Sequence, residues 1–221
     1  MGSRAYASAV REDAARRTKL GIAQAARDAF LRDGYASTSM ASIARAAGVS
    51  GQTVYNVFGT KAHLLKYVYD ITLVGDDEQV PFARRPEVLA LYGLQDPRKF
   101  LTGYARIGLV LLERLGPLVG VVMAGAAAGS PDLVAHLETM GRERLIGATM
   151  AARQVASLSP LRPDVDLDRA RDAIWTLNSV EVWRLLTVAR GWSDERYVTW
   201  VGRAMADALL PDEAGSPGAA P

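Results

Sequence analysis

Apolar residues recur at helical spacing along most of the chain. Between positions 16 and 33, Ala23, Ala26 and Phe30 lie three or four residues apart and therefore share one face of a helix. No stretch has the strict alternation of apolar and polar residues, bounded by turn dipeptides, that is typical of a strand. The pattern predicts an all-α protein with about nine helices.

Start and stop signals divide this pattern into elements. Side chains that can cap a helix N-terminus precede several apolar runs, and glycine or proline follows several of them. The expected N-caps are Ser39, Ser50, Thr60, Asp166 and Ser193, and Gly34 is the expected end of the first helix. The expected helices cover 16–33, 40–47, a third after Ser50, 60–73, 97–115, 117–128, 130–158, 166–190 and 193–210, with a short helical piece at 87–94.

Residues 38–61 predict two short helices joined by a tight turn. Gly48 stands where the chain must turn, and Ala44 and Val54 stand where the two helices must touch. A rotation of 100° per residue gives the second helix an inner and an outer face. The inner face holds Val54, Val57 and Phe58, and the outer face holds Gln52, Thr53 and Asn56, with Tyr55 on the flank. This arrangement is typical of a helix-turn-helix unit that reads DNA.

Positive charge is concentrated around this unit. The whole chain has a net charge of +2, but residues 14–66 carry eight cationic side chains against two acidic ones, a net +6. Such a local excess is the expected footprint of a protein that binds the phosphate backbone. A solvated charged surface is the alternative interpretation.

Residues 16–66 resemble the TetR/AcrR-like family of bacterial transcriptional regulators. The resemblance is carried by Gly34-Tyr35, Thr38-Ser39, Ile43-Ala44, Ala47-Gly48-Val49-Ser50, Thr53-Val54-Tyr55, Phe58-Gly59-Thr60-Lys61 and Leu64-Leu65. It implies a homodimer whose N-terminal parts bind a dyad-symmetric operator DNA and whose larger C-terminal part binds a small-molecule inducer. Two positions depart from the commoner pattern, because Gly51 stands where a basic residue is frequent and Val57 where His or Tyr is frequent.

The resemblance also implies roles for single residues and a division into domains. Thr38, Tyr55 and Lys61 would contact phosphates, while Gln52, Thr53 and Asn56 would face base edges. Because Gln and Asn amides pair with adenine and a Thr methyl can touch a thymine methyl, we expect A·T pairs in each half-site. The residues expected at the DNA are Thr38, Ser39, Ser50, Gln52, Thr53, Tyr55, Asn56 and Lys61. The expected domains are a disordered tail at 1–13, the helix-turn-helix domain at 14–66, a ligand-binding and dimerisation domain at 67–211, and a disordered tail at 212–221.

The C-terminal helices carry more apolar surface than one neighbouring helix would cover. By the resemblance, two of them pair with their symmetry mates in a four-helix bundle, whereas a purely intramolecular core is the alternative. The expected dimer contacts are Trp175, Val182, Leu186, Tyr197, Trp200, Val201, Ala204, Met205 and Ala208. Polar groups among aromatic residues could line an inducer pocket, and ordinary core packing is again the alternative. The candidate pocket residues are Met123, Met140, Trp175, Asn178, Glu181 and Trp183.

Residue types suited to catalysis are scarce. The chain has two histidines, His63 and His136, no cysteine and no phosphate-cradling glycine loop, so we expect no enzyme, metal site or cofactor. The lack of cysteine agrees with a cytoplasmic location. The apolar stretch 115–128 is shorter than the ~20 residues that span a membrane, and no targeting segment is visible, so we expect no membrane partner. Two other functions remain open: an all-helical small-molecule-binding protein without DNA binding, and a constitutive DNA-binding protein without an inducer.

Overall fold

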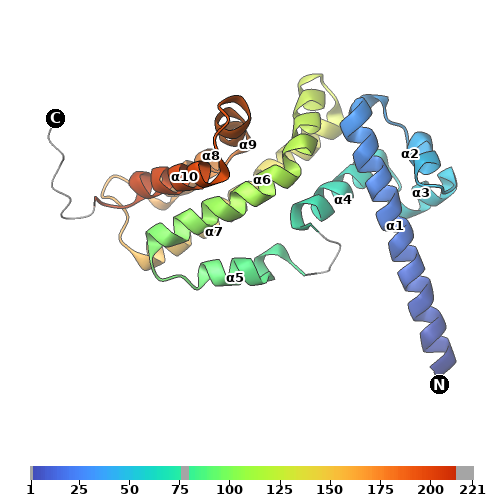
Figure 1. Cartoon of the computed structure of the whole chain (residues 1–221), viewed down its shortest axis with the longest axis horizontal. Helices are drawn as coiled ribbons and strands as arrows, with labels where there is room; N and C mark the ends of the chain where they lie inside the picture. The colour runs from blue at the N-terminus through green and yellow to red at the C-terminus, as the bar shows by residue number, and fades with distance from the viewer. Residues whose placement is uncertain (1, 76–79, 213–221) are drawn as a thin grey trace. The chain divides into compact units, whose positions relative to one another are not determined.

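The computed structural model describes residues 2–75 and 80–212, with side chains from Val10 onward, and every regular element in these ranges is helical (Figure 1). The all-α prediction is therefore confirmed. The first helices are α1 (Gly2–Ser37), α2 (Met40–Ala46), α3 (Gly51–Phe58) and α4 (Lys61–Val74). They are followed by the 3₁₀ segment η1 (Phe82–Arg84), α5 (Pro86–Tyr92), α6 (Pro97–Ala127) and α7 (Pro131–Leu158). The last elements are α8 (Leu167–Leu177), α9 (Val180–Trp183), the π-helical segment η2 (Arg184–Ala189) and α10 (Asp194–Leu209).

The helix starts that the sequence predicts are capped as expected. In each, a side-chain oxygen accepts a hydrogen bond from the backbone N–H three residues further on. The residues concerned are Ser39, Ser50, Thr60, Asp166 and Ser193. At the start of α2 the pairing is reciprocal, because the Ser39 and Ser42 hydroxyls each accept from the other residue's backbone N–H at 3.1 Å.

The first helix is longer than expected. It begins at Gly2, so residues 2–13 are helical, and the prediction of a disordered tail at 1–13 is wrong for them. An ion pair of 2.7 Å between Arg17 and Asp13, one turn apart, favours this extension. At the other end Gly34 has a φ of +80°, which interrupts the regular helix where the sequence predicts its end. The tail expected at 212–221 lies outside the described residues, apart from Asp212.

The chain divides into two compact units. The first unit contains Met1–Gln79 and Arg114–Thr139, and the second contains Val80–Glu113 and Met140–Pro221. The expected boundary between residues 66 and 67 does not separate compact units, because all of α4 belongs to the first unit. Val68 and Tyr69 of α4 are buried, and α4 packs against α1. The helices α6 and α7 contribute to both units.

Pro117 does not end a helix. Two helices were expected, at 97–115 and 117–128, but α6 continues through Pro117. Proline removes the hydrogen bond that its N–H would donate to the residue four positions earlier, and its ring crowds that residue's carbonyl. The neighbouring side chains of Leu118, Val119 and Val122 are buried, and this packing stabilises the helix despite that loss.

The sequence analysis expected no membrane partner because the apolar stretch 115–128 is too short to span a bilayer. That reason does not hold for α6, which is longer than this stretch. With 31 residues, α6 is long and apolar enough to cross a membrane by length and composition. The same helix buries Phe100, Leu101 and Ala105 completely in the core of the second unit. Burial against other helices of the same chain is the pattern of a core helix in a globular protein.

The helix expected at 166–190 is interrupted after Leu177. Asn178 has φ −96° and ψ 51°, which are not helical values, and Ser179 then caps α9 by accepting a hydrogen bond of 3.2 Å from the Val182 N–H. The expected single helix is thus divided into α8, α9 and η2.

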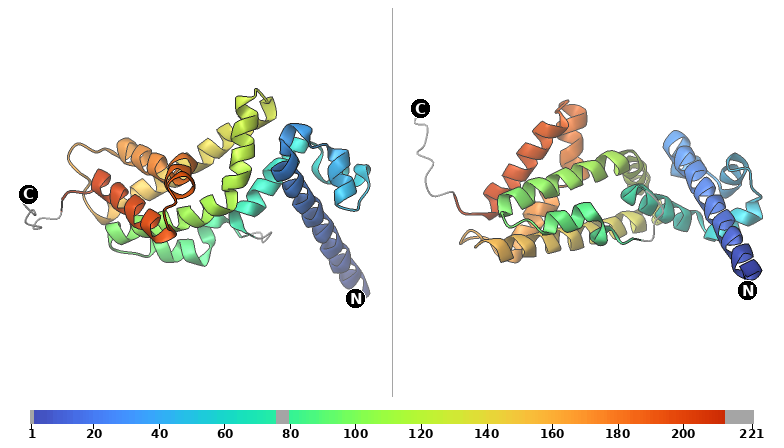
Figure 2. Two further views of the ribbon diagram at one scale, coloured as in Figure 1. Left: turned by 45° about the horizontal axis from the view of Figure 1, so that its top comes forward. Right: turned by 60° about the horizontal axis from the view of Figure 1, so that its bottom comes forward.

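The core of the second unit includes the contact between α10 and the first half of α6 (Figure 2). Gly202 permits this contact, since a Cβ atom there would lie 2.8 Å from the Thr102 Cα. Tyr197, Val201 and Met205 of α10 are completely buried.

Candidate nucleic-acid interface

The turn between α2 and α3 depends on Gly48. Its φ of +68° lies in the left-handed region, which other residues rarely adopt. The Val49 N–H donates to the Ala44 carbonyl at 3.0 Å, and the Gly48 N–H donates to the Arg45 carbonyl at 3.3 Å. These two bonds form a Schellman motif, which closes the end of α2 and directs the chain into α3.

Apolar side chains hold α2 and α3 together within the first unit. Ile43 and Val54 are completely buried, and Ala44 and Phe58 are almost so. These are residues that the sequence places on the inner faces, and the helix-turn-helix arrangement follows from their burial. Val57, also expected on the inner face of α3, is instead 39% exposed, so that prediction is wrong. The rings of Phe58 and Tyr67 lie 5.4 Å apart, which connects α3 to α4.

The outer face of α3 presents polar groups to solvent. Gln52 and Asn56 are exposed, and the Gln52 Nε2 donates to the Asn56 Oδ1 at 2.8 Å. Tyr55 beside them is 54% exposed. Thr53 is half-buried, and its hydroxyl lies 2.8 Å from that of Ser50, so both hydroxyls are engaged at the start of the helix. Ser39 is exposed and caps α2.

Thr38 is placed differently from the expectation. Its side chain is only 2% exposed, and its hydroxyl lies 2.8 Å from the Gly34 carbonyl oxygen and 3.3 Å from that of Ala29. A buried hydroxyl that donates to backbone carbonyls of α1 cannot reach a phosphate. The Thr38 side chain therefore stabilises the connection between α1 and α2, and the prediction that it contacts a phosphate is wrong.

Lys61 is also engaged within the fold. Its Nζ donates to the carbonyls of Tyr35, at 2.8 Å, and Thr38, at 2.9 Å, and lies 4.1 Å from the centre of the Tyr35 ring. Burial lowers the pKa of Lys61, an effect that the charge of Asp132 opposes. An ammonium group has three N–H donors, so one remains for a phosphate.

Ion pairs offset part of the positive charge of this region. Arg17 and Arg32 each pair with a carboxylate of α1 at 2.7 Å, while Lys19 lies 4.0 Å from the centre of the Tyr67 ring. Arg45, in the last turn of α2, is exposed and makes no ion pair within the described residues. Its exposed place beside the turn adds Arg45 to the candidate phosphate contacts.

The residues expected at a dimer interface separate into three groups by their burial. Tyr197, Val201 and Met205 are completely buried inside the second unit, so they cannot contact another chain without unfolding it. Trp175 and Trp200 are 38% and 44% exposed. The other four, Val182, Leu186, Ala204 and Ala208, are partly buried, and all of them except Ala204 pack against the same core. Leu185 and Val188, which belong to the apolar surface of the helix expected at 166–190 but not to the expected dimer contacts, are 62% and 63% exposed.

The six candidate pocket residues do not form one group. Met123 belongs to the first unit, and the other five belong to the second. Met140 is buried, Glu181 is exposed, and the Trp175 ring is covered by the Arg144 guanidinium at 4.9 Å. Asn178 and Trp183 are the two with unusual features, since the Asn178 Oδ1 and the Trp183 Nε1 are buried without a hydrogen-bond partner in the described structure.

A polar cluster surrounds Asn178 in the core of the second unit. Burial raises the pKa of Tyr104 to about 12, while a hydrogen bond from Asn178 opposes this shift. Burial likewise raises the pKa of Tyr197 to about 12, and its hydroxyl also lacks a partner among the described residues. The positive charge of Arg144 acts on both phenols. Buried polar atoms are rarely left unpaired, so this cluster is a candidate for binding a polar ligand. The sequence analysis did not select Tyr104, and it placed Tyr197 at the dimer interface because Tyr197 lies on a helical apolar stripe.

Comparison with known proteins identifies the N-terminal segment. The sequence model of the family described as bacterial regulatory proteins, tetR family, matches residues 22–68. This match covers the end of α1, the helix-turn-helix and half of α4. A comparison with curated proteins gives no match.

Several solved structures share the fold over most of the chain. NalD, the secondary repressor of the MexAB-OprM multidrug efflux pump in Pseudomonas aeruginosa, is 21% identical, with a TM-score of 0.66 over 89% of this chain and 97% of NalD. The complex of SmeT with triclosan has the same identity and TM-score, over 93% and 97% of the two chains. MexZ, a repressor responsible for antibiotic resistance in Pseudomonas aeruginosa, is 19% identical, with a TM-score of 0.60 over 89% and 96%.

At these identities the structural likeness concerns the fold alone, whereas the family match rests on the residues of the helix-turn-helix. The two findings agree with the buried contact between α2 and α3 and with the helical second unit. Residues 22–68 therefore match the tetR family of bacterial regulatory proteins, and the chain shares the all-helical fold of solved TetR-family regulators.

Proposed function

We propose that this protein is a cytoplasmic transcriptional repressor that binds a dyad-symmetric operator as a homodimer and is released by a small-molecule inducer. The family match supports a transcriptional regulator, and proteins of the same fold include repressors. The observation that carries the proposal is the outer face of α3, where Gln52 and Asn56 are exposed above the buried Val54 and Phe58.

The paired amides give this face a hydrogen-bonding pattern suited to adenine. The Gln52 Nε2 donates to the Asn56 Oδ1, which leaves the Gln52 oxygen as an acceptor and the Asn56 amide nitrogen as a donor. Adenine offers a donor at N6 and an acceptor at N7 in the major groove. Each well-formed bidentate contact contributes about 1–3 kcal/mol of preference for the right base. We therefore expect A·T pairs within each half-site.

Phosphate contacts would come from groups around this face. Tyr55 and Arg45 are exposed, and Lys61 retains one N–H donor. Ser39 and Ser50 lie at the starts of α2 and α3, where free backbone N–H groups favour an anion. These contacts position the protein on the duplex, whereas Gln52, Thr53 and Asn56 would read the sequence.

The dimer proposal is supported by exposed apolar side chains in the second unit. Leu185 and Val188 of η2 and Trp200 of α10 are all more than two-fifths exposed. A contiguous patch of exposed apolar residues marks a protein–protein interface, and these residues lie on η2 and α10, which contact each other. We expect sedimentation at micromolar concentration to give a dimer and Leu185→Glu/Val188→Glu to give a monomer. Leu89→Glu is the control, since Leu89 is 58% exposed on α5; a dimer unaffected by the double substitution contradicts this interface.

The inducer is proposed to bind at the polar cluster of Tyr104, Asn178 and Tyr197, together with Trp183, which packs against the same core. Three of these side chains have buried polar atoms without partners in the described structure, and a ligand with complementary donors and acceptors would satisfy them. The SmeT structure, which has the same fold, was solved with triclosan bound. For release, the ligand must bind the DNA-free arrangement more tightly than the DNA-bound one.

Selection of bound sequences from a random DNA library tests the operator part. We expect enrichment of inverted repeats with A·T pairs in each half, read through Gln52 and Asn56. The double variant Gln52→Ala/Asn56→Ala should lose the base preference, while Ser157→Ala, an exposed change on α7, should retain it. Enrichment of no sequence, or of a site without a repeat, contradicts the proposal. Loss of binding upon addition of a compound then identifies an inducer.

A further inference from the structure

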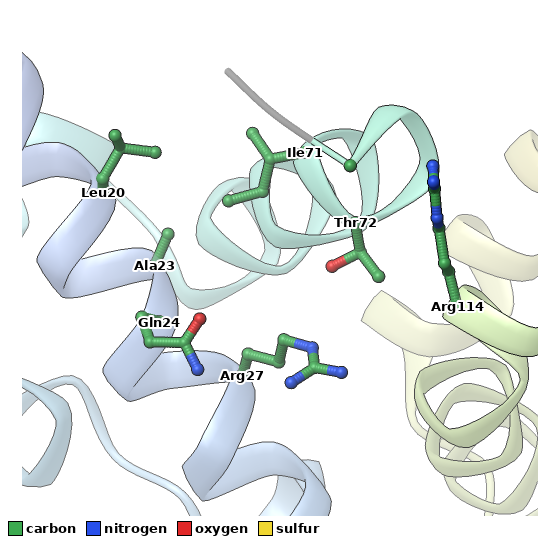
Figure 3. A pocket seen from close by; sticks show the side chains of 8 residues that line it. Leu20, Ala23, Gln24, Arg27, Ile71, Thr72 and Arg114 are labelled. Carbon is green, nitrogen blue, oxygen red and sulfur yellow. The ribbon is translucent and has the colours of Figure 1, made fainter.

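A hollow of about 460 Å³ lies inside the first unit and has no role in the proposed function (Figure 3). Its walls come from α1, α4 and the start of the first-unit part of α6. Figure 3 shows Arg27 extending from α1 and Arg114 rising from α6 toward the end of α4. Leu20 and Ile71 form apolar parts of the wall.

The described walls of this hollow are positively charged. They include Arg27 and Arg114 but no carboxylate. Arg27 forms an ion pair with Asp28, but the distance of 3.9 Å between the guanidinium and the carboxylate is long. Asp28 also accepts a hydrogen bond of 2.9 Å from Gln24. Arg114 donates to the Val74 carbonyl at 3.2 Å and makes no ion pair within the described residues. Both guanidinium groups therefore retain donors for an anion, since each has five N–H groups.

We propose that this hollow binds a small carboxylate with a compact apolar body. A guanidinium group matches a carboxylate in a two-pronged hydrogen bond, and two such groups favour an anion over a neutral molecule. The apolar walls at Leu20 and Ile71 favour an apolar body over a bare inorganic ion. The volume lies at the lower end of the range typical of small-molecule sites. A benzoate-sized or hexanoate-sized molecule meets these conditions.

This site is separate from the polar cluster proposed for the inducer. It lies wholly in the first unit, between helices that position α3, whereas the cluster lies in the second unit. A ligand there would connect α1 to α4 and would stabilise the folded first unit by mass action. The binding claim stands without the proposed repressor function, and only an effect on operator affinity would depend on it.

Isothermal titration of the full-length protein without DNA tests the proposal. Benzoate and hexanoate are expected to bind one per chain, and the uncharged benzamide and hexanamide at least tenfold more weakly, because charged hydrogen bonds are lost. Arg27→Gln is expected to weaken benzoate binding about tenfold or more. Arg32→Gln is the matched control, since Arg32 is an exposed arginine of the same helix that pairs with Asp33 outside the hollow.

A second variant guards against an effect on folding. Arg114→Lys keeps the charge and one donor near the end of α4 but removes the guanidinium fork, so it should weaken benzoate binding while the circular dichroism spectrum stays unchanged. Equal binding of acid and amide, or equal affinity of Arg27→Gln and Arg32→Gln, overturns the proposal. If inorganic phosphate binds as tightly as benzoate, the claim that the hollow selects a ligand with an apolar body is wrong. None of these readouts involves operator binding, so failure here is distinguishable from failure of the repressor function.

Discussion

The hydroxyl of Tyr35 donates a hydrogen bond of 2.8 Å to the Asp132 Oδ2, which joins the end of α1 to the first turn of α7. The Tyr35 carbonyl accepts from Lys61, whose ammonium group also lies over the Tyr35 ring. Burial and the bond to Asp132 raise the pKa of Tyr35, so the hydroxyl stays protonated and can donate. One residue thus links α1, α4 and α7 immediately before the helix-turn-helix.

Tyr35→Phe is expected to lower the free energy of unfolding by about 1 kcal/mol, the usual net value of one hydrogen bond. The ring and its contact with Lys61 remain, so the change isolates the bond to Asp132. Urea denaturation followed by circular dichroism measures the effect. Tyr55→Phe is the control. The Tyr55 side chain is 54% exposed, so removing its hydroxyl should leave the free energy of unfolding unchanged. Equal stability of both variants would show that the Tyr35–Asp132 bond contributes nothing.

Gly48→Ala is expected to destabilise the first unit by about 1–2 kcal/mol, the cost of a left-handed conformation for a residue with a Cβ. The space around Gly48 is open, so strain in the backbone is the whole effect. Gly51→Ala is the matched control, since Gly51 is equally open, lies in the first turn of α3 and has an ordinary φ. It should be neutral or slightly stabilising. Thermal denaturation of the two variants compares them directly, and similar melting temperatures would contradict the role of the turn.

Gln52→Ala is expected to relax the base preference at one position of each half-site by about 1–3 kcal/mol without changing stability. The side chain is exposed and bonds only to Asn56, so the fold does not depend on it. Fluorescence anisotropy with operators substituted one base pair at a time measures the preference. Lys61→Met should instead weaken all sequences alike and lower stability, because two backbone carbonyls lose their donor. If the two variants behaved alike, the division into base and phosphate contacts would be wrong.

Stability is expected to fall as the pH rises from 10 to 12. The pKa values of Tyr104 and Tyr197 are about 12 in the folded protein, because burial disfavours the phenolate, and about 10 in the unfolded chain. In that window the unfolded state loses protons that the folded state keeps, so each tyrosine lowers the free energy of unfolding by up to about 1.4 kcal/mol per pH unit. Below pH 10 both tyrosines are protonated in the folded and the unfolded state, so they do not make the free energy of unfolding depend on pH. Urea denaturation at pH 9, 10 and 11 measures it.

Tyr197→Phe provides the control for this pH dependence. The variant should lose part of the decline above pH 10, and near pH 8 it should be as stable as the parent or more so, because the buried Tyr197 hydroxyl has no partner in the described structure. A variant that is markedly less stable at pH 8 would mean that this hydroxyl is already satisfied, which would remove Tyr197 from the proposed inducer site.

Features that depend on neighbours in sequence were predictable. Ser39, Ser50 and Thr60 bond to N–H groups three residues away, and Gly48 is required by its own backbone angle, so residue type and spacing suffice. Helical rotation likewise predicts the buried Val54 and Phe58 and the exposed Gln52 and Asn56 of α3, but it fails at Val57, which is exposed. Prediction from the sequence failed where packing against residues far apart in the chain opposes a local preference of the backbone. At Pro117 the burial of the surrounding apolar residues outweighs one lost hydrogen bond, and the helix continues.

The sequence by itself determined the helical class, the helix starts, the turn at Gly48 and the side of α3 that faces solvent, because each rests on interactions within a few residues. Only the tertiary structure decided that Thr38 is buried against α1, that Lys61 binds the Tyr35 and Thr38 carbonyls, and that Tyr197 belongs to the core while Trp200 remains exposed. Those outcomes depend on which surfaces meet. An apolar stripe along a helix predicts that this face will be buried. Which surface buries it depends on packing among residues far apart in the chain.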